Sequence, residues 1–77
     1  MAKRMLEIVQ VTSHQGIDKI EVVSEPIDHL LVALDMAKLL FARLVICNPG
    51  SKIKNDFTLT TPNGEIIQLR LQHRQID

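Results

Sequence analysis

IDHLLVALDMAKLLFARLVIC, residues 27–47, is the stretch of this sequence that decides the fold. All but five of its residues are apolar, the exceptions being Asp28, His29, Asp35, Lys38 and Arg43. The length and the apolar spacing predict a single long helix, about 30 Å long at 1.5 Å per residue. Apolar residues occupy more than one side of this helix, so we expect it to pack in the core and to carry a second hydrophobic strip.

Both ends of the helix are marked by residues typical of helix boundaries. Ser24 can cap the N-terminus, and Pro26 suits the first turn because an N–H there would have no helical partner. Asn48-Pro49-Gly50 is expected to end the helix, since Asn48 can adopt a left-handed conformation and Pro49 cannot continue the helix. The apolar spacing leaves open whether residues 44–47 are the last helical turn or the start of an extended segment.

The two sides of the helix can be read from a rotation of 100° per residue. The side expected against the rest of the domain contains Leu30, Ala33, Leu34, Ala37, Leu40, Phe41 and Leu44. The opposite side mixes polar and small residues with three large aliphatic residues spaced seven apart: Asp28, Asp35, Ala42 and Arg43, with Val32, Leu39 and Ile46.

These three aliphatic residues have two interpretations. They can be ordinary exposed apolar residues, which are common on protein surfaces. They can also form a strip that packs on a second chain, with charged residues along its border. We favour the second interpretation because the domain is small and the residues are aligned. It predicts a homodimer, or a complex with a protein partner, through Val32, Leu39 and Ile46, bordered by Asp35, Lys38 and Arg43.

The rest of the chain predicts two β-hairpins. Residues 5–12 and 17–24 form the first, joined by a turn that contains Gly16. Residues 53–61 and 65–74 form the second, in which Asn63-Gly64 is the strongest short-range signal for a hairpin turn. Alternation places Ile67, Leu69 and Leu71 on the inner side of the last strand.

The order strand–strand–helix–strand–strand predicts a single α+β domain over residues 1–77, with one long helix on a four-stranded sheet. This order resembles the β-grasp architecture of ubiquitin-like and immunoglobulin-binding domains. The resemblance is topological and implies that the first and last strands lie parallel at the centre of the sheet, joined by a right-handed crossover. An open antiparallel sheet is the alternative.

Composition excludes several classes of protein. The nine basic and nine acidic residues cancel, which is unlike the strongly basic surface of a typical nucleic-acid-binding protein. A single cysteine excludes an internal disulfide and a multi-cysteine metal site, and it favours the cytoplasm. The charges within residues 27–47 exclude a membrane span, so no membrane association is expected. Aromatic residues are only 3% of the chain, so the core must be aliphatic, and small cores of this kind often rely on oligomerisation.

No reactive group of side chains can be recognised in the sequence. The three histidines, His14, His29 and His73, lack the spacing of metal ligands. Cys47 is predicted to be a small buried residue, because free cysteine is usually buried. The glycines are isolated turn residues and form no phosphate-binding loop. The sequence therefore predicts no enzyme, no metal and no cofactor.

The outer side of the second hairpin is polar and mildly basic. Its candidate residues for contacting nucleic acid are Lys52, Lys54, Gln68, Arg70, Gln72 and Arg74. Sheets that read single-stranded RNA normally display stacking aromatic residues, and both phenylalanines are expected in the core here. We therefore predict a small non-catalytic module for protein interaction or regulation, homodimeric through its helix. Weak nucleic-acid binding through the second hairpin is the alternative.

Overall fold

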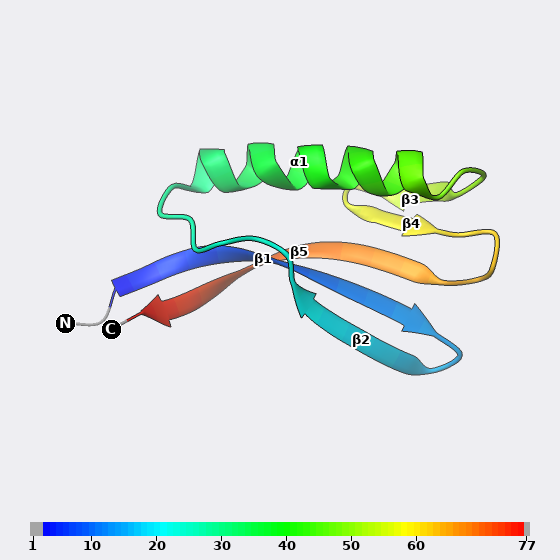
Figure 1. Ribbon diagram of the computed structural model, residues 1–77, viewed down its shortest axis with the longest axis horizontal. Helices are drawn as coiled ribbons and strands as arrows, with labels where there is room; N and C mark the ends of the chain where they lie inside the picture. Colours follow the sequence, from blue (N-terminus) through cyan, green and yellow to red (C-terminus); the bar gives the residue numbers. More distant parts are fainter. Residues whose placement is uncertain (1–2, 77) are drawn as a thin grey trace.

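A computed structural model describes residues 3–76 of the chain. In order, the elements are β1 (Lys3–His14), β2 (Ile17–Val22), α1 (Leu30–Cys47), β3 (Lys52–Asn55), β4 (Thr58–Thr60) and β5 (Ile66–Ile76). The single helix lies along one side of an antiparallel sheet (Figure 1), which confirms the predicted α+β class. The sheet has five strands rather than the predicted four, because residues 53–61 form two short strands instead of one.

Two long strands, β1 and β5, form the middle of the sheet, whose strand order is β2-β1-β5-β4-β3. They pair antiparallel from Lys3 opposite Ile76 to Ser13 opposite Ile66. The prediction that first and last strands run parallel, as in the β-grasp architecture, is therefore wrong, and the open antiparallel sheet is correct.

An additional turn between β3 and β4 explains the direction of β5. Phe57 adopts a positive φ of 65° there, and its ring meets the ring of Phe41 edge to face, with 6.0 Å between their centroids. The chain consequently reverses three times between the end of α1 and β5, where the β-grasp architecture requires two reversals. One extra reversal turns the last strand antiparallel to β1.

The helix begins later than predicted because the segment before it pairs with β1. Leu6 and Ile27 exchange two backbone hydrogen bonds of 2.7 Å each. Ser24 does not cap α1; its Oγ accepts a hydrogen bond of 2.8 Å from the backbone N–H of Ile8. His29 is the N-cap instead, and its Nδ1 accepts from the N–H of Leu31 at 3.2 Å.

The helix α1 ends at Asn48 as predicted, but Asn48 has a φ of −125° and not the expected left-handed conformation. The structure also settles the open question of residues 44–47. These residues are helical. The backbone N–H of Asn48 and its side-chain amide both donate to the carbonyl oxygen of Leu44, at 3.0 and 2.8 Å. Asn48 therefore ends the helix by satisfying a carbonyl group that the helix itself leaves free.

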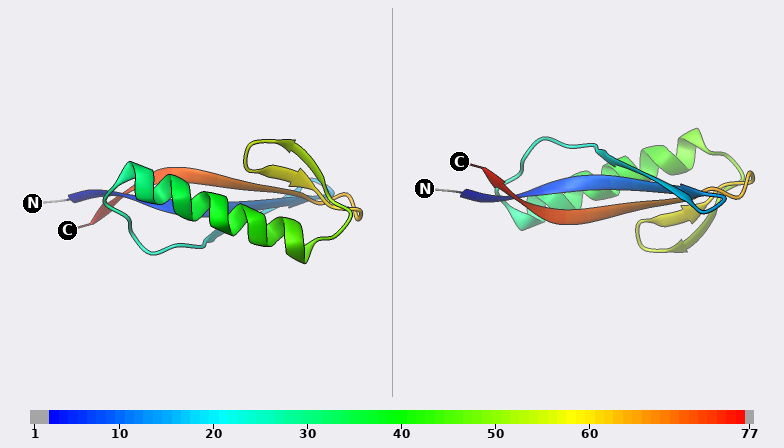
Figure 2. Two further views of the ribbon diagram at one scale, coloured as in Figure 1. Left: turned by 90° about the horizontal axis from the view of Figure 1, so that it is seen from above. Right: turned by 90° about the horizontal axis from the view of Figure 1, so that it is seen from below.

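The core lies between α1 and the two central strands. Its buried residues are Ile8, Ile27, Ala33, Ala37 and Leu69. Viewed from above, α1 crosses β1 and β5 obliquely, and the β3–β4 hairpin lies beside its C-terminal half (Figure 2). The domain is elongated, 45 × 25 × 17 Å along its principal axes.

Candidate functional site

The side of α1 that faces away from the sheet carries three large aliphatic side chains, as the sequence predicts. Val32, Leu39 and Ile46 are 49%, 69% and 77% exposed. Asp35 and Arg43 lie on the same side and are exposed too. We call these five residues the outer helix surface. Its residues are aligned because a spacing of seven is nearly two helical turns.

The inner side of α1 explains why so much hydrophobic volume faces outward. Ala33 and Ala37, at 0% and 3% exposure, face the sheet close to Ile8 and Leu69. Such small residues let the helix approach the sheet closely. The bulky residues of the inner side flank this contact and are only partly buried: Met36, Leu40, Phe41 and Leu44.

A shallow groove runs beside the outer helix surface. Its lining is aliphatic apart from one guanidinium group and consists of Met36, Leu39, Leu40, Ala42, Arg43 and Ile46. Lys38, which the sequence placed at the border of the interface, lies elsewhere. It lines a second hollow on the flank of α1 toward β3, together with Phe41 and Phe57. Of the predicted interface residues, all except Lys38 therefore share the outer side of the helix.

The face of the sheet opposite α1 is the second exposed surface. In antiparallel sheets, residues directly opposite each other share a face, so the register defines its members. Val9 pairs with Val22 on one side and Arg70 on the other, and Val11 pairs likewise with Ile20 and Gln68. Because Ile8 packs under α1, its neighbour Val9 faces away from the helix. We call this the open sheet face.

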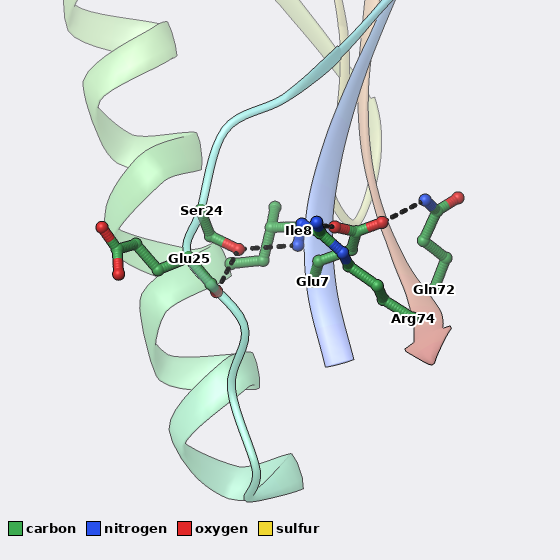
Figure 3. Close-up of polar contacts among 6 residues, drawn as sticks. All are labelled: Glu7, Ile8, Ser24, Glu25, Gln72 and Arg74. Atoms are coloured by element: carbon green, nitrogen blue, oxygen red, sulfur yellow. Dashed lines mark hydrogen bonds and ion pairs between the residues drawn. The ribbon is translucent and has the colours of Figure 1, made fainter. Parts of the chain in front are cut away.

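A buried carboxylate lies on the open sheet face beside two long side chains of β5 (Figure 3). Glu7 is only 5% exposed, and its Oε1 accepts a hydrogen bond of 2.6 Å from Gln72. Arg74 lies 3.5 Å from the second carboxylate oxygen, Oε2, which has no hydrogen-bond partner among the described residues. Arg74 thus serves to compensate a buried charge, which the sequence pattern did not reveal because Glu7 is 65 residues or more away from both partners.

The predicted nucleic-acid surface is only partly assembled. Alternate residues of β5, namely Gln68, Arg70, Gln72 and Arg74, share the open sheet face. Lys52 joins them, since it pairs with Thr60, which pairs with Ile66. Lys54 falls where the register of β3 is irregular. Arg70 donates from Nε to Gln68 at 3.0 Å, and no acidic partner is found for it among the described residues.

The candidate reactive residues do not gather at one place. His14 ends β1, His29 caps α1 and His73 lies on β5. Within residues 3–76, no group of three or more His, Cys, Asp or Glu side chains could hold a metal ion. Cys47 is exposed, so the prediction that it is buried is wrong: the last turn of α1 extends past the covered part of the core.

Comparisons with protein-family models, curated proteins and solved structures found no match for this chain. In the described part of the chain, α1 is the one helix, and it lacks the combination of length and hydrophobicity needed to cross a membrane.

Proposed function

We propose that this chain is a small, non-catalytic protein-interaction module that forms a homodimer through the outer helix surface. The observation that carries the proposal is the symmetry of this surface about Leu39. Val32 and Ile46 lie seven residues before and after Leu39, and Asp35 and Arg43 lie four before and after it. Such a surface is self-complementary when two copies pack with their helices antiparallel.

The symmetric packing gives each residue a suitable neighbour. A two-fold axis at Leu39 places Val32 beside the partner's Ile46 and Asp35 beside the partner's Arg43. The apolar residues form a central strip, and two opposite-charge pairs border it, about 6 Å from the axis along each helix. Charged borders of this kind fix orientation and register more than they add affinity.

The shape of the domain supports association. A compact chain of this length is expected to have a radius of gyration of about 11.5 Å, whereas the value here is 13.5 Å. The accessible surface is 5657 Å², and a folded monomer of this mass is expected to expose about 4,700 Å². The excess of roughly 900 Å² is close to the area that one partner contributes to an ordinary stable interface.

Other features agree with a binding role in the cytoplasm. The three histidines lie on different elements, and Cys47 is exposed as a free thiol. An exposed free thiol is typical of a reducing compartment. We therefore infer that the module acts in the cytoplasm.

Sedimentation of the wild type and of Leu39→Glu tests this proposal. Leu39→Glu puts two carboxylates on the symmetry axis, so the Kd of the helix-mediated dimer should rise at least a hundred-fold. The fold should remain intact because the side chain of Leu39 is exposed. Ile53→Glu is the matched control, since Ile53 is a similarly exposed aliphatic residue on β3. An association state unchanged by Leu39→Glu would refute the helix interface.

Nucleic-acid binding is the second candidate, favoured by Arg70 and Lys52, which share one face and have no ion pair among the described residues. It ranks lower for two reasons. The charge of Arg74 is paired with Glu7, and the residues opposite Gln68 and Arg70 on β1 are valines, not aromatic residues on which bases could stack. Fluorescence anisotropy with labelled RNA and DNA at low salt tests it. Binding that falls steeply with salt and is weakened by Arg70→Gln would support it; no change in anisotropy would remove it.

A further inference from the structure

The strand β2 forms an edge of the sheet that no other element of residues 3–76 pairs with. All six of its residues are exposed, including the apolar side chains of Ile17, Ile20 and Val22. Figure 1 shows β2 on the side of β1 that is turned away from α1, so its outer edge is directed away from the rest of the domain. An exposed, regular edge strand is a ready template for pairing with another strand.

The opposite edge of the sheet is protected where β2 is not. β3 has four residues, two of them lysines, and its register is irregular between Ile53 and Asn55. Short length, exposed lysine and irregular pairing are the usual means by which proteins prevent edge-to-edge association. β2 is longer and regular, and the ammonium group of its one lysine, Lys19, is held by Glu21 at 2.9 Å.

The register shows which backbone groups of β2 are free. The N–H and carbonyl of Ile8 bond toward the β2 side, to Ser24 and Val23. By alternation, Gln10 and Thr12 also direct their backbone groups toward β2, where they face Glu21 and Lys19. Ile17, opposite His14, is directed inward in the same way, so the other three residues of β2 direct their N–H and carbonyl groups outward: Asp18, Ile20 and Val22.

We propose that β2 pairs antiparallel with β2 of a second copy of this chain, about a two-fold axis at Ile20. This register makes Ile20 a hydrogen-bonded pair with the partner's Ile20, and Asp18 a hydrogen-bonded pair with the partner's Val22. All of these residues carry outward backbone groups. The two five-stranded sheets then become one continuous sheet, and the edge is removed.

The charges of β2 fit the same register. Lys19 lies opposite the partner's Glu21, and Glu21 opposite the partner's Lys19, in non-hydrogen-bonded pairs, whose side chains are the closest in antiparallel sheets. Within one chain, the hydrogen bond from Lys19 to Glu21 already raises the pKa of the lysine above its ordinary value. The second copy offers each lysine a second carboxylate.

The pairing also brings exposed apolar side chains next to the two-fold axis. Ile20 and Val22 lie on the open sheet face beside Val11 and Val9. Across the axis, Ile20 packs beside the partner's Ile20, and Val22 lies opposite the partner's Asp18. Val11 and the buried Val9 support these residues from β1, one strand further from the axis. The partner's helix lies at the far end of the joined sheet, because β2 and α1 are on opposite sides of the domain (Figure 1).

The edge pairing does not depend on the helix-mediated dimer, since it uses a different surface. Where both form, they link copies from opposite sides of each domain. The mass of the wild type should therefore rise with concentration beyond that of a dimer. Leu39→Glu should stop association at a dimer held by β2, and a monomeric Leu39→Glu protein at millimolar concentration would overturn the edge pairing.

Charge reversal within the Leu39→Glu protein tests the register itself. Lys19→Glu and Glu21→Lys each place like charges opposite one another, so each variant alone should be monomeric. Mixed together they regain opposite charges across the axis and should form a heterodimer by sedimentation. Lys54→Glu, a reversal on the protected edge, is the matched control and should leave the dimer intact. Single variants that dimerise like their parent, or a mixture that stays monomeric, would refute this register.

A backbone substitution gives an independent test. Ile20→Pro removes an outward N–H without removing a bond to β1, and edge strands tolerate proline at such positions. Circular dichroism should show the fold retained, while the β2-mediated dimer weakens at least ten-fold in Kd. A folded Ile20→Pro protein with unchanged association would also overturn the proposal.

Discussion

The two sides of α1 use hydrophobic residues in opposite ways. The inner side places Ala33 and Ala37 on the sheet, where both are buried, whereas the outer side exposes Leu39 and Ile46. Small residues at the contact allow close packing, so they stabilise the monomer out of proportion to their size. The large outer residues gain nearly nothing from folding, because their surface stays in water. Their hydrophobic free energy is released only on association.

The largest expected effect on stability comes from a residue beneath the inner side of α1. Ile8→Ala removes a fully buried side chain beneath α1 and should lower the free energy of unfolding by about 2–5 kcal/mol. Leu39→Ala removes a similar volume from the outer side and should change it by less than about 0.5 kcal/mol in the monomer. Urea denaturation at low protein concentration measures both. Equal losses would mean that the outer surface is packed within the monomer.

The outer side of α1 could be predicted from the sequence because it depends only on helical periodicity. Val32, Leu39 and Ile46 are spaced seven apart, and the structure exposes all three. Asp35 and Arg43 follow from the same periodicity. The second hairpin turn was equally local, since Gly64 supplies the positive φ, here 87°, that an Asn-Gly turn needs.

The features that sequence reasoning missed depend on contacts between distant residues. Residues 53–61 alternate like one strand, but Phe57 has a positive φ that divides them. Its ring packs on Phe41, and its carbonyl accepts a hydrogen bond of 2.9 Å from the N–H of Leu69. Serine is a residue type that often caps helices, but the hydroxyl oxygen of Ser24 instead accepts a hydrogen bond from the N–H of Ile8, 16 residues earlier. The direction of β5 and the start of α1 follow from these contacts, so neither could be read from local pattern.

Enlarging one alanine on each side of α1 should give a smaller difference in stability between the two sides. Ala37→Leu adds three carbons where α1 meets the sheet, and this overpacking should lower the free energy of unfolding by about 1–3 kcal/mol. Ala42→Leu makes the same change on the exposed side and should leave the monomer's stability within about 0.5 kcal/mol of the wild type. Thermal unfolding of the two variants side by side decides it. Similar melting temperatures would contradict close packing at Ala37.

The smallest expected effect on stability comes from the N-cap of α1, which belongs to neither the inner nor the outer side of the helix. His29 caps α1 through its Nδ1, at 3.2 Å from the N–H of Leu31. Aspartate is a stronger N-cap and places negative charge at the positive end of the helix dipole. His29→Asp should therefore raise the free energy of unfolding by about 0.5 kcal/mol, while the Kd of self-association stays unchanged because the outer helix surface is untouched. His14→Asp, the same substitution at the exposed end of β1, is the control and should give no such gain. If both variants were stabilised equally in urea denaturation, the gain would come from overall charge and not from the cap.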